Sequence, residues 1–261
     1  MRATINGIQV AYTDEGDGAP LLLVHGFPLN RGTWSKQVAA FKTSYRVIAP
    51  DLRGFGESET TAGAISMSRF AEDLHTLLQH LHTGPVTLVG HSMGGYVALA
   101  FAKAFPRALR GLVLVGTKAG ADTPEGAAAR REMAEKVRVE GPSLVVNAMA
   151  PKMLSASNTD ATMVASVRTF MGPTQPEGVI GALLGMADRP DAGTWLGKIH
   201  TRTLVIAGMD DLLIPPSESE AMMMAIPSAQ LKLIPKAGHL VAFESAEAFN
   251  EALWVWLAWG G

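Results

Sequence analysis

Short apolar runs rich in branched residues recur along the chain, and each ends at a glycine, a proline or a polar turn. Continuous runs of this kind are typical of strands buried on both faces of a parallel sheet. The N-terminal residues differ, because Ile8, Val10 and Tyr12 alternate with polar neighbours. The preceding Asn6-Gly7 dipeptide favours a tight turn, so an antiparallel hairpin is expected at the sheet edge. The continuous runs predict further strands at residues 21–24, 46–49, 86–89, 112–115, 203–207 and 230–234.

Stretches with helical spacing lie between these runs. Residues 70–81 place apolar side chains on one stripe of period 3.6, residues 93–105 are small and apolar, and residues 249–257 repeat the helical spacing. Parallel strands must be joined by crossovers, and helical crossovers cover the faces of the sheet. The alternation therefore predicts an α/β fold, with a mostly parallel, twisted sheet covered by helices on both faces.

The alternation stops between residues 122 and 196, where helical segments follow one another without a strand-like run. Caps and Gly-Pro or Ser-Asn breaks predict helices at residues 123–139, 143–154, 160–171 and 176–187. We expect residues 122–196 to form an inserted helical subdomain, and residues 1–121 and 197–261 to form the core domain. Six of the 13 methionines lie in this insert, where their flexible thioethers either fill an irregular core or line an adaptable apolar pocket.

Composition narrows the possible functions. The 261 residues are 48% hydrophobic, which suffices for one well-cored domain with an insert. The net charge of −2 without a basic run argues against a nucleic-acid partner, and the absence of cysteine excludes thiolate catalysis and Cys-ligated metals. No apolar stretch approaches the roughly 18 residues of a membrane span, and the first residues lack a secretory apolar stretch. We therefore expect a cytoplasmic protein without membrane attachment.

One motif carries nucleophilic chemistry. The sequence G-H-S-M-G at residues 90–94 directly follows a predicted strand and directly precedes a predicted helix. A G-x-S-x-G motif in this context predicts a sharp elbow that exposes the serine at the carboxyl edge of the sheet, with small flanking residues leaving room for the turn. We therefore predict that Ser92 is the nucleophile.

A serine nucleophile needs a base and a group that orients the base. His239 follows Gly238 in a loop after the last predicted strand, which places it at the same edge of the sheet as Ser92. Two candidate acids, Asp210 and Asp211, follow the strand at 203–207, and both satisfy the order serine, acid, histidine. The residues alone leave the choice between these two aspartates open.

The remaining expectations concern the oxyanion and bound groups. The backbone amide of Met93 follows the nucleophile, and that of Phe27 lies in the loop after the strand at 21–24, so these two N–H groups are expected to form the oxyanion hole. His25, in the same loop, is expected to be structural.

The histidines at 75, 80 and 82 do not gather on one helix face, and no Walker or G-x-G-x-x-G sequence occurs. We therefore expect neither a metal nor a cofactor.

Taken together, these motifs resemble the α/β-hydrolase superfamily over nearly the whole chain. The motifs that carry the resemblance, in family order, lie at residues 21–28, 51–58, 90–95, 208–215 and 238–240. In that family the triad acid is the third residue after the glycine, which selects Asp211, and the oxyanion amides correspond to Phe27 and Met93. The sequence is most similar to compact bacterial carboxylesterases and enol-lactone hydrolases, which carry a helical cap. It departs where the family often has Glu-x-Pro, because Ala246 follows Glu244-Ser245 here.

The resemblance implies a serine carboxylesterase that hydrolyses small, short-acyl esters through an acyl-enzyme on Ser92. Serine at the elbow argues against haloalkane dehalogenases and epoxide hydrolases, which place an aspartate there. Two alternatives remain open. One is a lactonase acting on enol-lactones or acyl-homoserine lactones, and the other is a ligand sensor that uses the same fold without turnover. The expected partner is a small-molecule ester, and no oligomeric state is predicted.

Overall fold

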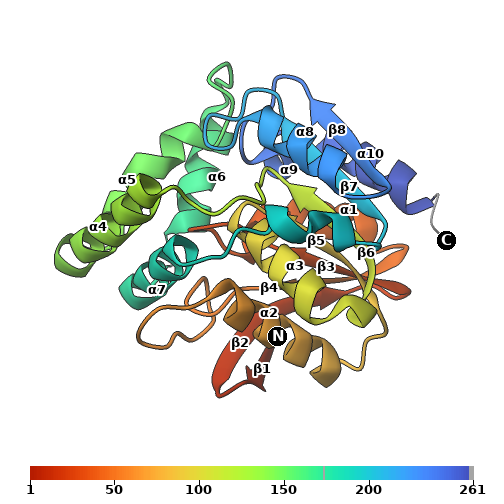
Figure 1. The fold of residues 1–261 in the computed structure, drawn as a ribbon, viewed down its shortest axis with the longest axis horizontal. Helices are drawn as coiled ribbons and strands as arrows, with labels where there is room; N and C mark the ends of the chain where they lie inside the picture. The colour runs from red at the N-terminus through yellow and green to blue at the C-terminus, as the bar shows by residue number, and fades with distance from the viewer. Residues whose placement is uncertain (173, 259–261) are drawn as a thin grey trace.

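A computed structural model describes residues 1–172 and 174–258 of the chain. Its centre is an eight-stranded sheet in the order β1-β2-β4-β3-β5-β6-β7-β8 (Figure 1). β1 and β2 form an antiparallel hairpin and β2 pairs antiparallel with β4, whereas all later pairs are parallel. The strands are β1 (Arg2–Ile5), β2 (Ile8–Glu15), β3 (Ala19–Val24), β4 (Tyr45–Pro50), β5 (Val86–His91), β6 (Leu109–Val115), β7 (Thr203–Gly208) and β8 (Ala229–Ile234).

The predicted strands and hairpin are confirmed. Asn6 and Gly7 both have positive φ, 47° and 82°, as a tight hairpin turn between β1 and β2 requires. β5 and β7 are buried along their whole length, which is why their sequences read as continuous apolar runs. Because β3 and β5 to β8 are parallel, their carboxyl ends lie at one edge of the sheet.

Helices cover both faces of this sheet, as predicted. The helices are α1 (Ser35–Phe41), α2 (Met67–His80), α3 (Met93–Ala104), α4 (Pro124–Glu140), α5 (Ser143–Met149), α6 (Ala161–Met171), α7 (Pro176–Ala187), α8 (Pro216–Ala225), α9 (Val241–Glu244) and α10 (Ala246–Ala258). In the described part of the chain, four 3₁₀ helices accompany them, namely η1 (Arg31–Trp34), η2 (Pro106–Ala108), η3 (Ala150–Lys152) and η4 (Gly193–Lys198).

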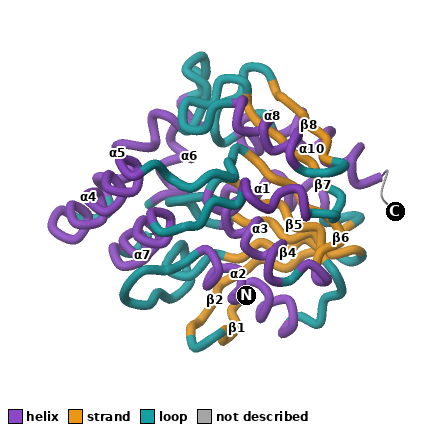
Figure 2. Tube along the Cα trace, viewed as in Figure 1, coloured by secondary structure: helices purple, strands orange, loops and turns teal. Residues whose placement is uncertain are grey.

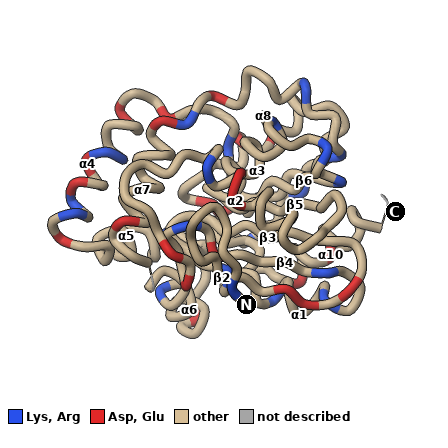
Figure 3. Tube along the Cα trace, turned by 90° about the horizontal axis from the view of Figure 1, so that it is seen from below, with Lys and Arg blue, Asp and Glu red and all other residues tan. Residues whose placement is uncertain are grey.

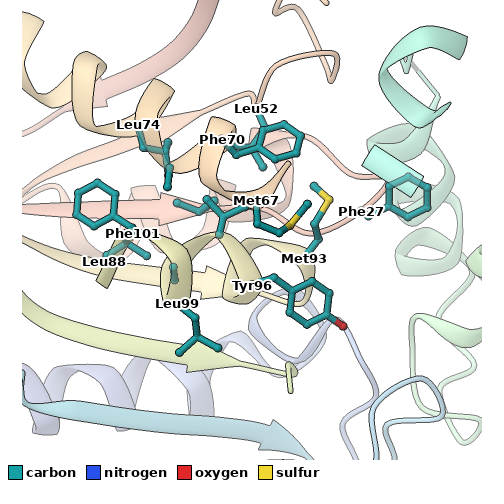
Figure 4. Packing of buried hydrophobic residues seen from close by; sticks show 14 of the residues in the cluster. Phe27, Leu52, Met67, Phe70, Leu74, Leu88, Met93, Tyr96, Leu99 and Phe101 are labelled. Carbon is teal, nitrogen blue, oxygen red and sulfur yellow. The ribbon is translucent and has the colours of Figure 1, made fainter. Parts of the chain in front are cut away.

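Alternate residues of each strand supply the two cores. On one face, β-strand side chains such as Leu88 and Leu114 pack under α2, α3 and α8, and Figure 4 shows part of this cluster with Phe70 of α2 and Phe101 of α3. On the other face, strand residues such as Val113 pack against α1 and α10. This period-two alternation between two apolar cores explains why β5 and β7, buried along their whole length, carry apolar residues at consecutive positions.

Helices α4 to α7 form a group at one side of the sheet (Figures 1 and 2). In the described residues between 122 and 196, no strand occurs, as predicted. The predicted helix at 143–154 is wrong in its length, because α5 ends at Met149 and η3 follows. Pro151 has no N–H to donate to the carbonyl four residues before it, which ends the α-helix there.

The surface mixes both signs of charge. Basic and acidic residues alternate along α4 (Figure 3), where Lys136 and Glu132 lie 2.7 Å apart and Arg138 and Glu135 lie 3.3 Å apart. Such exposed pairs at helical spacing contribute only a few tenths of a kcal/mol each. Among the described helices, none combines the length and the apolar character that a membrane crossing needs. Pro173 and the last three residues of the predicted core segment lie outside the described residues.

Candidate active site

Ser92 occupies a sharp turn between the end of β5 and the start of α3. Its φ of 53° and ψ of −116° are strained for a residue with a Cβ atom. The turn is possible because its neighbours are small: a Cβ at Gly90 would overlap the carbonyl oxygen of Gly94. The serine backbone is held on both sides, since its N–H donates to Val115 O at 2.9 Å and its carbonyl accepts from Thr117 Oγ1 at 2.8 Å.

His239 and Asp211 form a buried pair at the same sheet edge. Nδ1 of His239 lies 2.8 Å from Oδ2 of Asp211, and both side chains are almost fully buried. An ionised carboxylate only accepts hydrogen bonds, so Nδ1 carries the proton and Nε2 is left as the acceptor that a general base requires.

The surroundings of Asp211 keep it ionised. Its second oxygen, Oδ1, accepts from the amides of Leu213 at 2.8 Å and Ile214 at 2.9 Å. Burial acts to raise the pKa of Asp211, but the hydrogen bonds from His239 and from these two amides outweigh it and hold the pKa below its usual value. The neighbouring Asp210 instead accepts a hydrogen bond from Ser155 Oγ at 2.6 Å. The structure therefore brings Asp211, rather than Asp210, to His239.

His91 joins the elbow to the loop that carries His239. The two imidazole rings lie 4.8 Å apart, and Nε2 of His91 lies 2.9 Å from the carbonyl oxygen of His239. Burial, with His239 as a further cause, lowers the pKa of His91 to about 3, so it is neutral and donates its Nε2–H to that carbonyl. Within the described residues, Ser92 Oγ makes no hydrogen bond to His239. Catalytic hydrogen bonds are often long without substrate and tighten when it binds.

Of the two amides predicted for the oxyanion hole, that of Met93 directly follows Ser92, and that of Phe27 belongs to the loop after β3. A Cβ at Gly26, next to Phe27, would lie only 2.9 Å from Ser92 Cβ, so the loop after β3 passes directly beside the serine. Phe27 and Met93 are 4% and 0% exposed. Across the described residues, neither backbone N–H donates a hydrogen bond. Two buried donors without protein partners beside a serine can receive a developing negative charge.

His25 and Asp51 shape the loop around Phe27. His25 accepts from the amide of Leu52 through Nε2 at 3.0 Å, and its Nδ1 lies 2.9 Å from Gly26 O. Burial lowers the pKa of His25, in keeping with the structural role expected for it. The buried carboxylate of Asp51 accepts from the backbone and guanidinium of Arg31. The motif at 51–58 thus supports the loop after β3 through the hydrogen bonds of Leu52 with His25 and of Asp51 with Arg31.

Several residues that support the candidate site were not predicted from the sequence. Thr117 fixes the Ser92 carbonyl, and Ser155 binds Asp210, although nothing in their local sequence indicated either contact. In the described part of the chain, no cluster of three or more His, Asp or Glu side chains could hold a metal ion. His75, one of the three histidines considered for a metal site, stacks on Phe105 with ring centroids 4.0 Å apart.

A mostly parallel, doubly covered sheet with a serine elbow and a His–Asp pair at its carboxyl edge defines a hydrolase of the α/β class. The comparison with known families agrees: the profile described as alpha/beta hydrolase fold matches residues 19–246, and the chain belongs to this family.

The relatives of the chain include hydrolases of several kinds. A 2-hydroxymuconate semialdehyde hydrolase from Pseudomonas putida is 31% identical, and the match covers 93% of this chain and 88% of the relative. A thermophilic esterase from Thermogutta terrifontis, solved with malate bound, is 42% identical with a TM-score of 0.96, covering 100% of this chain and 98% of that one. An enol-lactonase from Burkholderia xenovorans LB400 is 26% identical with a TM-score of 0.92, covering 99% and 100%.

Proposed function

We propose that the protein is a serine carboxylesterase acting on small, short-acyl esters. The observation that carries the proposal is the 2.8 Å pair of His239 and Asp211 at the sheet edge where the elbow presents Ser92. The 42% identity to an esterase over the whole chain supports the same reaction class. No metal or cofactor takes part in the proposed reaction.

In the proposed mechanism, Ser92 Oγ attacks the ester carbonyl carbon while His239 Nε2 takes the hydroxyl proton. Asp211 holds the imidazole in the required tautomer and stabilises the imidazolium. The amides of Phe27 and Met93 donate to the oxyanion of the tetrahedral intermediate. As the intermediate collapses, the alcohol leaves with the proton from His239. Water then attacks the acyl-enzyme, His239 accepts its proton and returns it to Ser92 Oγ, and the acid is released.

We further propose that residues 122–196 act as a cap that sets the size of the acyl group. Met153 and Met171 are fully buried against Leu29, so these two thioethers fill the core of the insert. Met149 and Met163 are only partly buried and remain candidates for the acyl pocket. The outer surface of α4 carries ion pairs instead of an apolar strip, which favours soluble esters over emulsified lipids.

The test is hydrolysis of aryl acetate, butyrate and octanoate by the purified protein and by Ser92→Ala. We expect fastest turnover on the short esters and a loss of at least about 1,000-fold in kcat for Ser92→Ala, with unchanged thermal unfolding. Ser68→Ala, an exposed serine on α2, serves as the matched control. Substantial turnover by Ser92→Ala contradicts the mechanism, and a preference for octanoate contradicts the short-acyl assignment.

A lactonase is the second candidate, supported by the TM-score of 0.92 to an enol-lactonase. The same serine, base and oxyanion donors suit a lactone carbonyl. A butyrolactone and an acyl-homoserine lactone, measured beside matched linear esters, distinguish the two activities. A higher kcat/KM for a lactone than for its linear ester favours the lactonase.

A further inference from the structure

The loop that carries His239 is attached to the helical insert on both sides of the histidine. We call residues 236–240 the base loop and residues 153–158, between η3 and α6, the bracing segment. The amide of Leu240 donates to Met153 O at 2.7 Å. Gly238 lies so close to the bracing segment that a Cβ there would overlap the backbone of Leu154. The two neighbours of His239 thus touch a segment that is distant in the sequence.

The carboxylate of Glu244 closes this contact. Oε2 accepts from the amide of Gly238 at 2.6 Å, and Oε1 accepts from Asn158 Nδ2 at 2.7 Å. The amide of Ser155 lies 3.0 Å from Oε1 and 3.1 Å from Oε2. One carboxylate therefore accepts hydrogen bonds from the base loop and from the bracing segment at the same time.

The bracing segment reaches the acid loop as well. Ser155 is 3% exposed, and its hydroxyl donates to Asp210, the residue before Asp211. The amide of Asp210 in turn donates to Ala237 O in the base loop at 2.9 Å. The loops carrying Asp211 and His239 are thus joined to each other and to one short segment of the insert.

We propose that Glu244 is a positioning residue for His239, acting through Gly238 and the bracing segment. The proposal rests on the serine-hydrolase mechanism given above. Within the described residues, the hydrogen bonds to the carboxylate come from N–H donors, so an ionised side chain that only accepts hydrogen bonds fits them, and charge-assisted bonds of this kind are the stronger ones. An amide side chain would turn its NH₂ toward at least one donor. A small displacement of a general base strongly lowers the rate of the step that it catalyses, because proton transfer needs hydrogen-bond geometry.

The experiment compares Glu244→Gln and Glu244→Ala with Glu247→Gln, which makes the same chemical change on an exposed residue of α10. Three quantities are measured: kcat and KM on aryl acetate, the rate at which phenylmethanesulfonyl fluoride modifies Ser92 by intact mass, and the urea midpoint. For Glu244→Gln we expect kcat and the modification rate to fall by about 10-fold or more with KM within about 2-fold. For Glu244→Ala we expect larger falls in kcat and in the modification rate. Glu247→Gln should have the wild-type values of all three quantities.

A purely structural role predicts a different result. In that case Glu244→Gln lowers the urea midpoint while kcat per folded molecule and the modification rate stay at the wild-type values, which overturns the proposal. If Glu244→Ala does not fold, Asn158→Ala removes only one of the donors and should give a smaller loss in the same two rates. Modification of Ser92 needs no ester substrate. If the wild type is modified but hydrolyses no ester, the carboxylesterase assignment fails while the rates still decide the role of Glu244.

Discussion

The variable position of the elbow motif before Ser92 is filled by His91, a buried histidine that is neutral in the folded protein. Its Nε2–H bonds the carbonyl of His239, so this side chain supports the backbone of the proposed base. Burial lowers its pKa to about 3, whereas an unfolded chain has the ordinary value near 6.5. The protonated form of histidine is the charged one. When the pKa of such a group is lower in the folded state than in the unfolded chain, the group lowers the free energy of unfolding at acidic pH.

The first prediction concerns His91→Gln, which keeps a side-chain N–H donor but does not titrate. Below about pH 6.5 the unfolded wild type binds a proton at His91 that the folded protein does not. Its free energy of unfolding should therefore fall by up to about 1.4 kcal/mol per pH unit from this group, until the pH nears the folded pKa. Urea unfolding at pH 7, 5.5 and 4.5 should show a shallower decline for His91→Gln. Parallel declines for the two proteins contradict the prediction.

At the residue scale, the sequence predicted the elbow and the histidine but not their supports. Motif order and glycine spacing identified Ser92 and His239, and the family spacing selected Asp211 over Asp210. Glu244 was noted only for the missing proline after it, because its partner Ser155 is 89 positions away. Contacts of that kind have no local pattern, so only the folded chain reveals them.

Elements with continuous or periodic apolar residues were predicted, whereas the short helices α1 and α8, which bury a polar residue beside few apolar ones, were not. α1 was missed because it buries Gln37 beside Val38 and Phe41, and Nε2 of this Gln37 donates to Ala242 O at 2.7 Å, across 205 positions. α8 buries only Ser219 and Met222, which gives no apolar stripe. A buried polar residue with a distant partner removes the periodic signal on which the prediction depends.

Helix α7 docks on the core through glycines. A Cβ at Gly178 would overlap the carbonyl oxygen of Gly54, and a Cβ at Gly185 would overlap that of Ile65. The amide of Ile65 also donates to Gly181 O at 2.9 Å. Because α4 packs along α7, this close backbone approach ties the insert to the segment between β4 and α2.

The second prediction follows from this docking. Gly185→Ala should lower the free energy of unfolding by about 2 kcal/mol, because the added methyl forces the helix away from Ile65. Gly126→Ala in α4 is the control, since the nearest atom to its Cβ is 3.5 Å away. Gly126→Ala should not lower the free energy of unfolding, because alanine has the higher helix propensity and its methyl group meets no close neighbour. Equal urea midpoints for Gly185→Ala and the wild type contradict the docking argument.

Across the whole molecule, the chain enters and leaves the insert at adjacent points. The amide of Ala192 donates to Ala119 O at 3.0 Å, which holds the two crossings together. Asp122 in the outgoing crossing pairs with Arg130 of α4 and with Arg189 of the returning one, whose Nη1 lies 3.0 Å from Asp122 Oδ2. Arg189 also stacks over Tyr96 of α3 at 4.1 Å, so one ion cluster joins the insert to the central helix.

The third prediction tests this cluster with Asp122→Asn. The side chains of Asp122 and Arg189 are 6% and 3% exposed, so losing the carboxylate leaves a buried guanidinium without its charge partner. The free energy of unfolding at pH 7 should fall by roughly 3 kcal/mol. Burial acts to raise the pKa of Asp122, but the guanidiniums of Arg130 and Arg189 outweigh it and hold the pKa well below the usual value.

The contribution of Asp122 to the free energy of unfolding depends on pH. A carboxyl group with a lowered pKa contributes stability above the ordinary value near 3.8 and loses it as the pH falls below that value. The difference in urea midpoint between wild type and Asp122→Asn should therefore be full at pH 7 and shrink below about pH 3.8. A difference that is absent at pH 7 rules out the cluster as a tie between insert and core.

The sheet is open, with β1 at one edge and β8 at the other. Within residues 1–172 and 174–258, β8 pairs only with β7, so its outer side offers backbone donors and acceptors to any extended chain that approaches. Lys232 stands exposed in the middle of this strand. A second copy that added its own β8 there would bring two ammonium groups together and strip them of water. A charge at this position therefore disfavours edge-to-edge association between copies of the chain, a property separate from the chemistry at the carboxyl ends of the strands.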